Sequence, residues 1–261
     1  MVGPASATGA TLHGMSAKPQ VVIIGGVNGA GKTTIYPAIA SFKRLAPLHP
    51  KSIPRERFVN MDELAAEKNL SPMAAGRAVV KRRDELIARR ESFAYETTVS
   101  DEAQIGRMIT TLRASGYRVY FIYLTLENWE LSAVRVTQRA LTGGHYIPFE
   151  ALERRHDLSH AHFIQTCAPR SFFWLAADNS GLKPELIAWG WGEQAYVAHP
   201  ELFERRFPEA DQLHRCEPAE DKLTRAILRN IQQQVHRRLE SLPKVVARTY
   251  WDGKVRFTTP E

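Results

Sequence analysis

Residues 20–33 read QVVIIGGVNGAGKT, and this stretch decides the fold. Its first half is a short β-branched run, typical of a strand buried on both faces of a parallel sheet. Its second half, residues 26–33, matches the pattern Gly-x-x-x-x-Gly-Lys-Ser/Thr, and a helix is expected from about residue 31 to residue 42. A strand, a glycine-rich loop and a helix in this order predict a phosphate-binding loop (P-loop) in an α/β protein.

The P-loop predicts a nucleotide site for a physical reason. Glycines let the backbone curl until its N–H groups face a phosphate, and the helix N-terminus adds positive potential. Lys32 can then reach the β- and γ-phosphates of ATP, and the Thr33 hydroxyl can bind Mg²⁺. The residues expected to contact the nucleotide are Gly26, Asn28, Gly29, Ala30, Gly31, Lys32, Thr33 and Thr34. The alternative is a glycine-rich turn with a solvated lysine.

Beyond the P-loop, short apolar runs alternate with helical patterns. Helices are expected at residues 72–90, 101–114, 130–141 and 148–167, with strands between them. This alternation predicts an α/β fold of the P-loop kinase type, with a doubly wound, mostly parallel sheet flanked by helices. The chain divides into a flexible tail at 1–19, a kinase-like domain at 20–182 and a small α+β C-terminal extension at 183–261.

The extension is expected to hold two hairpins and one long helix. The first hairpin turns at residues 190–192, and the last turns at Asp252-Gly253, the strongest short turn signal in the chain. Between them, apolar residues recur every four positions over residues 219–242, which predicts an amphipathic helix. We expect these pieces to pack on or beside the main sheet.

The net charge of +7 at first suggests a nucleic-acid partner. However, residues 1–60 hold seven Lys or Arg and one acid, whereas the rest of the chain holds 28 basic and 27 acidic side chains. The excess is local, so binding along nucleic acid is not expected. No apolar run reaches the ~18 residues that would cross a bilayer, so no membrane association is expected either. Two cysteines without Cys-x-x-Cys spacing are typical of a cytoplasmic protein.

A second chemical group is needed to tell a kinase from other P-loop proteins. Asp62 follows the expected strand at residues 57–60, at the edge where doubly wound sheets gather their ligand groups. A carboxylate there can accept a proton from a hydroxyl that attacks the γ-phosphate. The alternative is that Asp62 caps the helix that begins there, and the two roles are compatible.

Three further motifs follow the P-loop in order. They are FVNMDELA at 58–65, SFAYETT at 92–98 and GGHYIP at 143–148, and the stretch DNSG at 178–181 closes the series. Together they resemble the zeta toxin family, from about Val21 to Gly181. The resemblance implies an ATP-dependent kinase similar to those that phosphorylate the sugar of UDP-N-acetylglucosamine, and it implies an antitoxin protein as a possible partner.

Carried over residue by residue, the resemblance assigns roles to several positions. Lys32 and Thr33 match the contacts to nucleotide and Mg²⁺, and Asp62 matches the general base. Glu96, Thr97 and Thr98 match the substrate-binding segment. The structural alternative for the two threonines is that they cap the next helix together with Asp101.

Arginines are expected to stabilise the charge that spreads over the transferred phosphoryl oxygens. Arg135 and Arg139 lie four apart on one helix and therefore share a face. Arg155 follows the Gly143-Gly144 loop, and His145 stands near the position of a phosphate-facing arginine of the family, so both are candidates for substrate binding. Glu127 follows an apolar strand without the usual metal-binding Asp, which disfavours a motor ATPase.

The sequence therefore predicts a kinase that transfers the γ-phosphate of ATP to a hydroxyl of a small molecule, with a nucleotide sugar as the first expectation. One alternative is a regulatory P-loop ATPase that binds a protein or nucleic acid. Another is a kinase for a different hydroxyl compound, such as a nucleoside or an antibiotic, because the scaffold does not dictate the acceptor.

Overall fold

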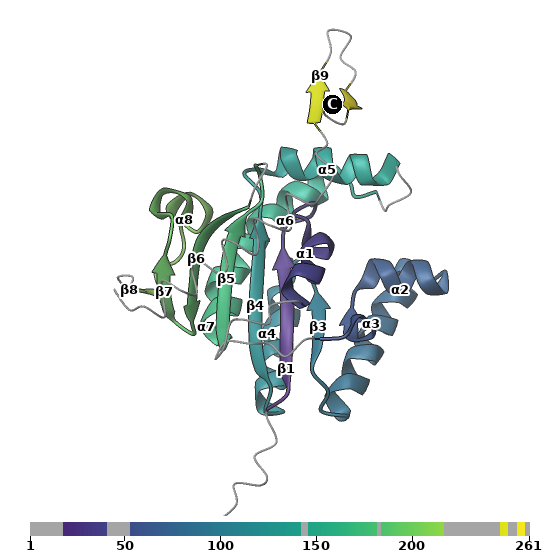
Figure 1. Cartoon of the computed structure of the whole chain (residues 1–261), viewed down its shortest axis with the longest axis vertical. Coiled ribbons are helices and arrows are strands. Elements are labelled where there is room, and N and C mark those ends of the chain that lie inside the picture. The colour runs from purple at the N-terminus through teal and green to yellow at the C-terminus, as the bar shows by residue number, and fades with distance from the viewer. Residues whose placement is uncertain are drawn as a thin grey trace, which may run out of the picture.

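The structure is a computed structural model that describes residues 18–40, 53–141, 146–181, 184–216, 246–249 and 255–258. Its centre is an eight-stranded sheet in the order β2-β3-β1-β4-β5-β6-β7-β8 (Figure 1). The strands are β1 (Gln20–Gly26), β2 (Phe58–Val59), β3 (Phe93–Glu96), β4 (Arg118–Thr125), β5 (Phe173–Asp178), β6 (Glu185–Trp191), β7 (Gln194–Val197) and β8 (His214–Cys216).

The first five strands of the sheet run parallel. β1 pairs with β3 on one side and with β4 on the other, β2 pairs with β3, and β5 pairs with β4. The chain therefore leaves β1, winds to one side for β2 and β3, and crosses to the other side for β4 and β5. This is the doubly wound α/β sheet of P-loop kinases that the sequence predicted, and it brings five carboxyl ends to one edge.

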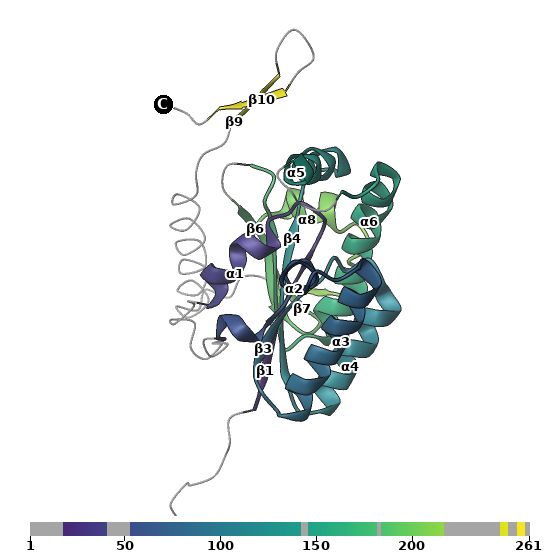
Figure 2. The same ribbon diagram turned by 90° about the vertical axis from the view of Figure 1, so that its right-hand side faces the viewer.

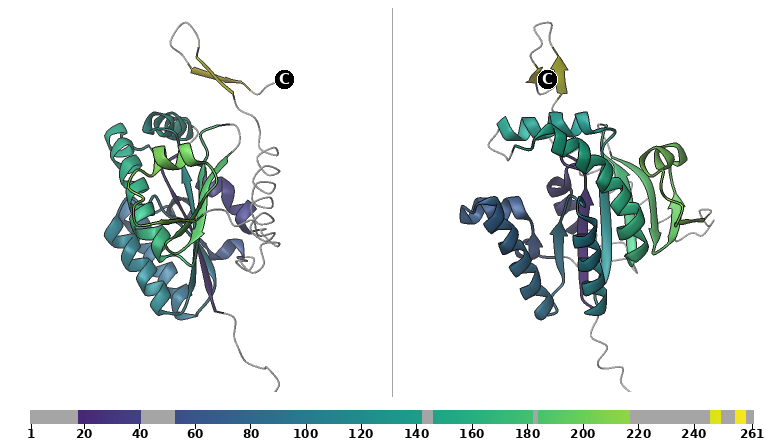
Figure 3. Two further views of the ribbon diagram at one scale, coloured as in Figure 1. Left: turned by 90° about the vertical axis from the view of Figure 1, so that its left-hand side faces the viewer. Right: turned by 180° about the vertical axis from the view of Figure 1, so that it is seen from behind.

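Helices connect the strands and cover both faces. They are α1 (Lys32–Ala40), α2 (Met61–Lys68), α3 (Pro72–Ala88), α4 (Glu102–Ala114), α5 (Trp129–Leu141), α6 (Phe149–His162), α7 (Ala168–Arg170) and α8 (Pro200–Arg206), with a 3₁₀ turn η1 (Arg55–Arg57) and a π turn η2 (Phe163–Cys167). α1 lies on one face of the sheet and α3, α4 and α6 lie on the other (Figure 2). Seen from behind, α4 and α6 cross in front of the strands (Figure 3). The helices expected at 72–90, 101–114 and 130–141 are confirmed within two residues at each end.

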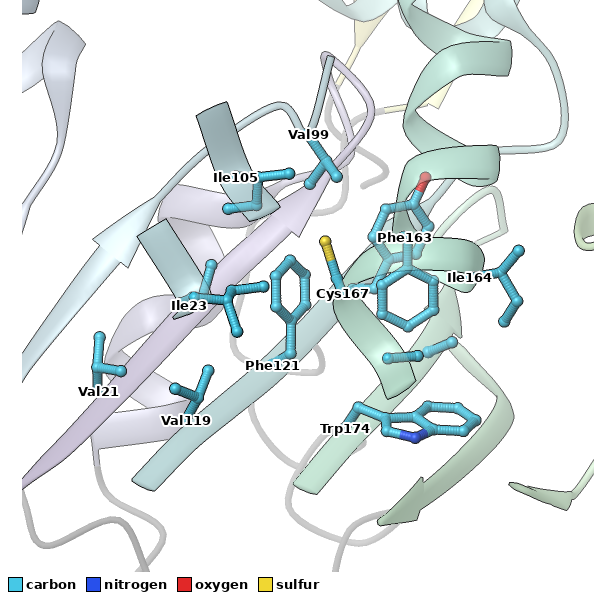
Figure 4. Close-up of a cluster of buried hydrophobic side chains, with 14 of the residues drawn as sticks. Val21, Ile23, Val99, Ile105, Val119, Phe121, Phe163, Ile164, Cys167 and Trp174 are labelled. Atoms are coloured by element: carbon cyan, nitrogen blue, oxygen red, sulfur yellow. The ribbon is translucent and has the colours of Figure 1, made fainter. Parts of the chain in front are cut away.

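Alternating side chains of the strands feed two hydrophobic clusters. Val21 and Ile23 of β1 point to the face covered by α3, α4 and η2, whereas Val22 and Ile24 point to the face that carries Tyr36 of α1. The first cluster is the larger, and Figure 4 shows Phe121 and Cys167 at its centre. A strand buried on both faces explains why residues 21–24 read as an uninterrupted apolar run.

The hairpin expected at the start of the extension is present and continues the main sheet. β6 pairs antiparallel with β5, and β7 pairs antiparallel with β6 through a turn at Gly192. Trp189 and Tyr196 stack across this pair with ring centroids 4.4 Å apart. This part of the extension is therefore built onto the sheet edge; the boundary at residue 182 stays a prediction.

Several expectations fall partly or wholly outside the described residues. These are the tail up to residue 17, the helix at 219–242 and the turn at Asp252-Gly253. The strands that flank this turn, β9 (Val246–Thr249) and β10 (Val255–Thr258), pair antiparallel as the sequence predicted. Within the described ranges, no helix combines the length and apolar character that crossing a membrane requires.

Candidate active site at the carboxyl ends of the strands

The P-loop leaves β1 at the carboxyl edge of the sheet, and α5 lies across this edge (Figure 1). Gly26 has a φ of +138°, and a Cβ there would lie 2.0 Å from the Leu124 carbonyl of β4. Gly31, at the start of α1, has a φ of +83°. Only glycine tolerates both constraints, which is the physical reason for glycine at these two positions. The amide oxygen of Asn28 is buried and has no hydrogen-bond partner among the described residues, as expected of a group beside a ligand site.

Lys32 is folded back into its own loop. Its ammonium donates to the carbonyl oxygens of Gly26 at 3.0 Å and Val27 at 2.9 Å, and the side chain is buried. Burial lowers the pKa of Lys32 to about 8, and Arg139 adds to the lowering, whereas Glu96 and Asp62 oppose it. Lys32 is therefore a cation held by neutral backbone oxygens, close to where a phosphate would lie.

Glu96 ends β3, the strand beside β1, and meets the P-loop directly. Its Oε2 accepts hydrogen bonds from Thr33 Oγ1 at 2.9 Å and from Asn60 Nδ2 at 2.6 Å. Burial raises the pKa of Glu96, although the charge of Lys32 and both hydrogen bonds oppose the shift. A carboxylate thus touches the hydroxyl that was predicted to bind Mg²⁺. The strand on the other side of β1, β4, is followed by Glu127, where the sequence lacks the usual metal-binding Asp.

Asp62 lies in the first turn of α2, where its carboxylate is exposed. The helix cap is Asn60, whose side chain accepts from the Glu63 N–H, so the idea that Asp62 is the cap is wrong. Asp62 Oδ2 lies 3.5 Å from Arg139 Nη1 of α5. The predicted base and one predicted arginine are therefore paired, and both charges act on Lys32.

Arg135, one turn before Arg139, bonds to backbone instead. Its guanidinium donates to the carbonyls of Asn179 at 2.9 Å, Ser180 at 3.1 Å and Gly29 at 3.5 Å. Burial lowers its pKa, and Asp178 opposes the shift. In this structure Arg135 ties the P-loop to the turn after β5; its expected contact with phosphate stays a prediction.

The segment after Glu96 is held under backbone strain. Val99 has a φ of +58°, which is unusual for a β-branched residue, and its side chain is buried beside Ile105 and Phe121 (Figure 4). Its carbonyl accepts from His162 Nδ1 at 2.9 Å, and the Thr98 carbonyl accepts from Ser159 Oγ at 2.8 Å. α6 therefore fixes the shape of this segment.

Thr97 and Thr98 do not cap the next helix. The Thr97 hydroxyl accepts from the Val99 N–H, and the Thr98 hydroxyl bonds to Ser100 Oγ at 3.0 Å. Asp101 alone caps α4, by accepting from the Gln104 N–H. The alternative reading of the two threonines as caps is therefore wrong, and their assignment to substrate binding stays a prediction.

Two candidates are not joined to this cluster. His145 lies outside the described residues. Arg155 is half-buried on α6, and within the described part of the chain no hydrogen bond or ion pair links it to Lys32, Asp62 or Glu96. Both assignments stay predictions.

Sequence reasoning missed Asn60 and Asn179. Asn60 precedes the helical run MDEL with a glutamate three residues later, so the N-cap pattern was a usable signal. Asn179 donates from Nδ2 to the Ala30 carbonyl at 2.9 Å, a contact between positions 149 residues apart that no local pattern reveals.

The site suits a triphosphate and a hard cation. Glycines with positive φ, a buried ammonium and a helix N-terminus favour anionic phosphate. The Thr33 hydroxyl and the Glu96 carboxylate supply adjacent oxygen ligands, which Mg²⁺ prefers. The described residues thus fit the nucleotide and metal that the sequence predicted.

Comparisons with known proteins agree with this fold. The family model described as zeta toxin matches residues 6–168, more than half of the chain. An uncharacterized protein of Haemophilus influenzae is 26% identical over 136 residues, which cover 50% of this chain and 88% of that protein.

Two solved structures match most of the chain. A crystal structure of the AvrRxo1-ORF1:AvrRxo1-ORF2 complex with ATP matches with a TM-score of 0.56 and 17% identity, over 87% of this chain and 82% of that chain. A structure from the PezAT chromosomal toxin–antitoxin system of Streptococcus pneumoniae matches with a TM-score of 0.46 and 17% identity, over 87% and 89% of the two chains. On the family match, the chain belongs to the zeta toxin family.

Proposed function

We propose that the protein is an ATP-dependent kinase that transfers the γ-phosphate to a hydroxyl of a small molecule, with a nucleotide sugar such as UDP-N-acetylglucosamine as the acceptor. The observation that supports this most is the cluster at the end of β1. Lys32 and the Thr33–Glu96 pair lie at the P-loop, and the paired Asp62 and Arg139 are close enough for their charges to act on Lys32. Phosphate-binding groups and a solvent-facing carboxylate are the parts that a small-molecule kinase needs.

The proposed chemistry begins when Asp62 exchanges Arg139 for the acceptor hydroxyl. Asp62 takes the hydroxyl proton as the acceptor oxygen bonds to the γ-phosphorus, and the bond from that phosphorus to the β-phosphate oxygen breaks, which leaves ADP. Lys32 and Arg139 offset the charge on the phosphoryl oxygens. Thr33 and Glu96 would hold Mg²⁺, which neutralises phosphate charge when bound.

Glu96 supports two roles within this proposal. The family resemblance assigns it to the acceptor, whereas its hydrogen bond with Thr33 supports a role beside the metal. One carboxylate can serve both, because its second oxygen remains available for a donor on the acceptor. Arg135, His145 and Arg155 are retained as further candidates for contact with phosphate or acceptor.

A partner protein is also proposed. Membership in the zeta toxin family favours an antitoxin that covers the nucleotide site. The AvrRxo1-ORF1 protein, which is similar in fold, forms a complex with AvrRxo1-ORF2. For this chain, a cytoplasmic location fits the proposed substrates.

The test is an acceptor screen. Purified protein is incubated with ATP labelled at the γ-phosphate, Mg²⁺ and a panel of nucleotide sugars, nucleosides, aminoglycosides and short RNA. Label on a nucleotide sugar is the expected result. Label on another small hydroxyl compound would support a kinase with a different class of acceptor. Label found only in inorganic phosphate would contradict the kinase proposal and favour a regulatory ATPase.

A further inference from the structure

The turn after β5, residues 178–180, is a second support of the P-loop. Asn179 Nδ2 donates to the Ala30 carbonyl at 2.9 Å, and a Cβ at Gly31 would lie 3.0 Å from the same nitrogen. Arg135 bridges the two segments, because its guanidinium bonds to Gly29 on the P-loop and to Asn179 and Ser180 on the turn. The outer half of the P-loop therefore depends on where this turn lies.

The turn itself is fixed by a buried ion pair. Asp178 Oδ1 accepts from the Ser180 N–H at 2.8 Å, which closes the turn. Asp178 Oδ2 accepts from both Nε and Nη2 of Arg206, at 2.9 and 2.8 Å. The two side chains are only 7% and 9% exposed. Arg206 is the last residue of α8, so the extension reaches the nucleotide site through one side chain.

We propose that Arg206 is a positioning residue. Its two hydrogen bonds to Asp178 hold the turn after β5 in the position that shapes the P-loop for a nucleoside triphosphate. This inference rests on the proposed ATP site and gives the extension a part in it. A planar guanidinium with two parallel donors fixes the carboxylate in direction as well as distance. Both partners follow residue 168, where the family match ends.

The neighbouring histidines do not replace Arg206. It lines a cavity of about 230 Å³ together with His156 and His160. Burial lowers the pKa of His160 to about 4, with His156 contributing, so His160 is neutral at pH 7 and cannot balance Asp178. Without Arg206, the Asp178 carboxylate would draw water or turn away, and the turn would be left with its contacts to Thr125, Glu127 and Arg135.

The test measures ATP binding, which needs no turnover. In Arg206→Gln, calorimetry should show the Kd for ATP raised about tenfold. Amide hydrogen exchange should quicken more at residues 29–31 and 178–180 than in α4, whose amides report only the global loss of stability. The matched control is Arg215→Gln, which breaks the exposed Arg215–Glu204 pair at 3.2 Å and should leave the Kd within about twofold.

Two further variants separate positioning from general loss of structure. Arg206→Lys keeps the positive charge but loses the two parallel N–H donors of the guanidinium, and it should still raise the Kd for ATP about threefold. The double variant Asp178→Asn/Arg206→Gln keeps a neutral hydrogen-bonded pair and should recover most of the affinity lost in Arg206→Gln. An unchanged Kd and unchanged exchange in Arg206→Lys would overturn the inference even if Arg206→Gln does not fold.

The test of the role of Arg206 does not depend on the result of the acceptor screen. If the wild-type protein binds ATP but phosphorylates nothing, the proposed function fails and the variants still test Arg206. If the protein transfers phosphate but the Arg206 variants bind ATP like the wild type, only this inference fails. If ATP does not bind at all, the exchange rates at residues 29–31 still report whether Arg206 holds the P-loop.

Discussion

Two Asp–Arg pairs lie at the carboxyl edge of the sheet, and they differ in every physical respect. Asp62 and Arg139 are 56% and 44% exposed, and Asp62 Oδ2 lies 3.5 Å from Arg139 Nη1. Asp178 and Arg206 are buried and meet at two contacts of 2.8 and 2.9 Å. An exposed single contact is worth about 0–1 kcal/mol and breaks easily, whereas a buried pair is costly to disrupt. The first pair suits groups that must turn toward a substrate, and the second suits a fixed support.

The sharpest way to break this comparison is Asp62→Asn. If Asp62 is the general base, this variant should have a kcat about 10²–10⁴ times lower than the wild type. Its Kd for ATP and its thermal midpoint should stay near the wild-type values. Steady-state kinetics with the acceptor found in the screen measures kcat, and calorimetry measures the Kd for ATP and the thermal midpoint. Asp84→Asn, which removes an exposed carboxylate paired with the half-buried Arg83, is the control for losing a surface carboxylate. Near-normal turnover in Asp62→Asn would contradict the base assignment.

The buried pair should show its effect in stability. Arg206→Gln leaves the Asp178 charge unpaired, which should lower the free energy of unfolding by about 3–5 kcal/mol and Tm by about 6–20 °C. Calorimetric melts of this variant and of Arg215→Gln compare a buried with an exposed arginine on neighbouring elements. Equal melting of the two variants would remove the distinction between the pairs.

Lys32 provides a pH test of the site. Burial holds its pKa near 8, and phosphate binds the charged form, so the unliganded protein must take up a proton before it binds ATP above that pH. The affinity for ATP should therefore fall about tenfold between pH 7 and pH 9, with proton uptake that rises toward about one per ATP. Calorimetry in buffers of different ionisation enthalpy measures both. Lys32→Arg stays charged, so this variant should lose the pH dependence of ATP affinity. A tenfold change that persists in the variant would show that a group other than Lys32 causes it.

The smallest expected effect is the coupling between Asp62 and Arg139. A double-mutant cycle of Asp62→Asn and Arg139→Gln should give an interaction free energy below about 1 kcal/mol in urea unfolding. The same cycle on Asp178 and Arg206 should give several times more. Similar values for the two cycles would show that burial does not separate the pairs.

The strand, loop and helix around the P-loop could be predicted from the sequence, whereas contacts between distant segments could not. The P-loop and Asp62 depend on local patterns, in which a strand, a turn and a helix follow within a few residues, and these patterns survive in a single sequence. Glu96 was found, but its contact with Thr33 depends on β3 lying beside β1, which is a property of the sheet order. Asp178 and Arg206 are 28 residues apart on separate elements, and an arginine at a helix end looks like any surface arginine. Burial decides its role, and burial is set by the fold.

Val99 also bears on how this protein would respond to selection for heat tolerance. Its left-handed backbone costs about 1–3 kcal/mol that glycine or asparagine would not incur. The Val99 side chain is buried, however, so glycine or asparagine would lose about as much stability through lost apolar burial. A library screened only for survival of heating should therefore keep valine at position 99, where the contacts with α6 hold the strained backbone after Glu96.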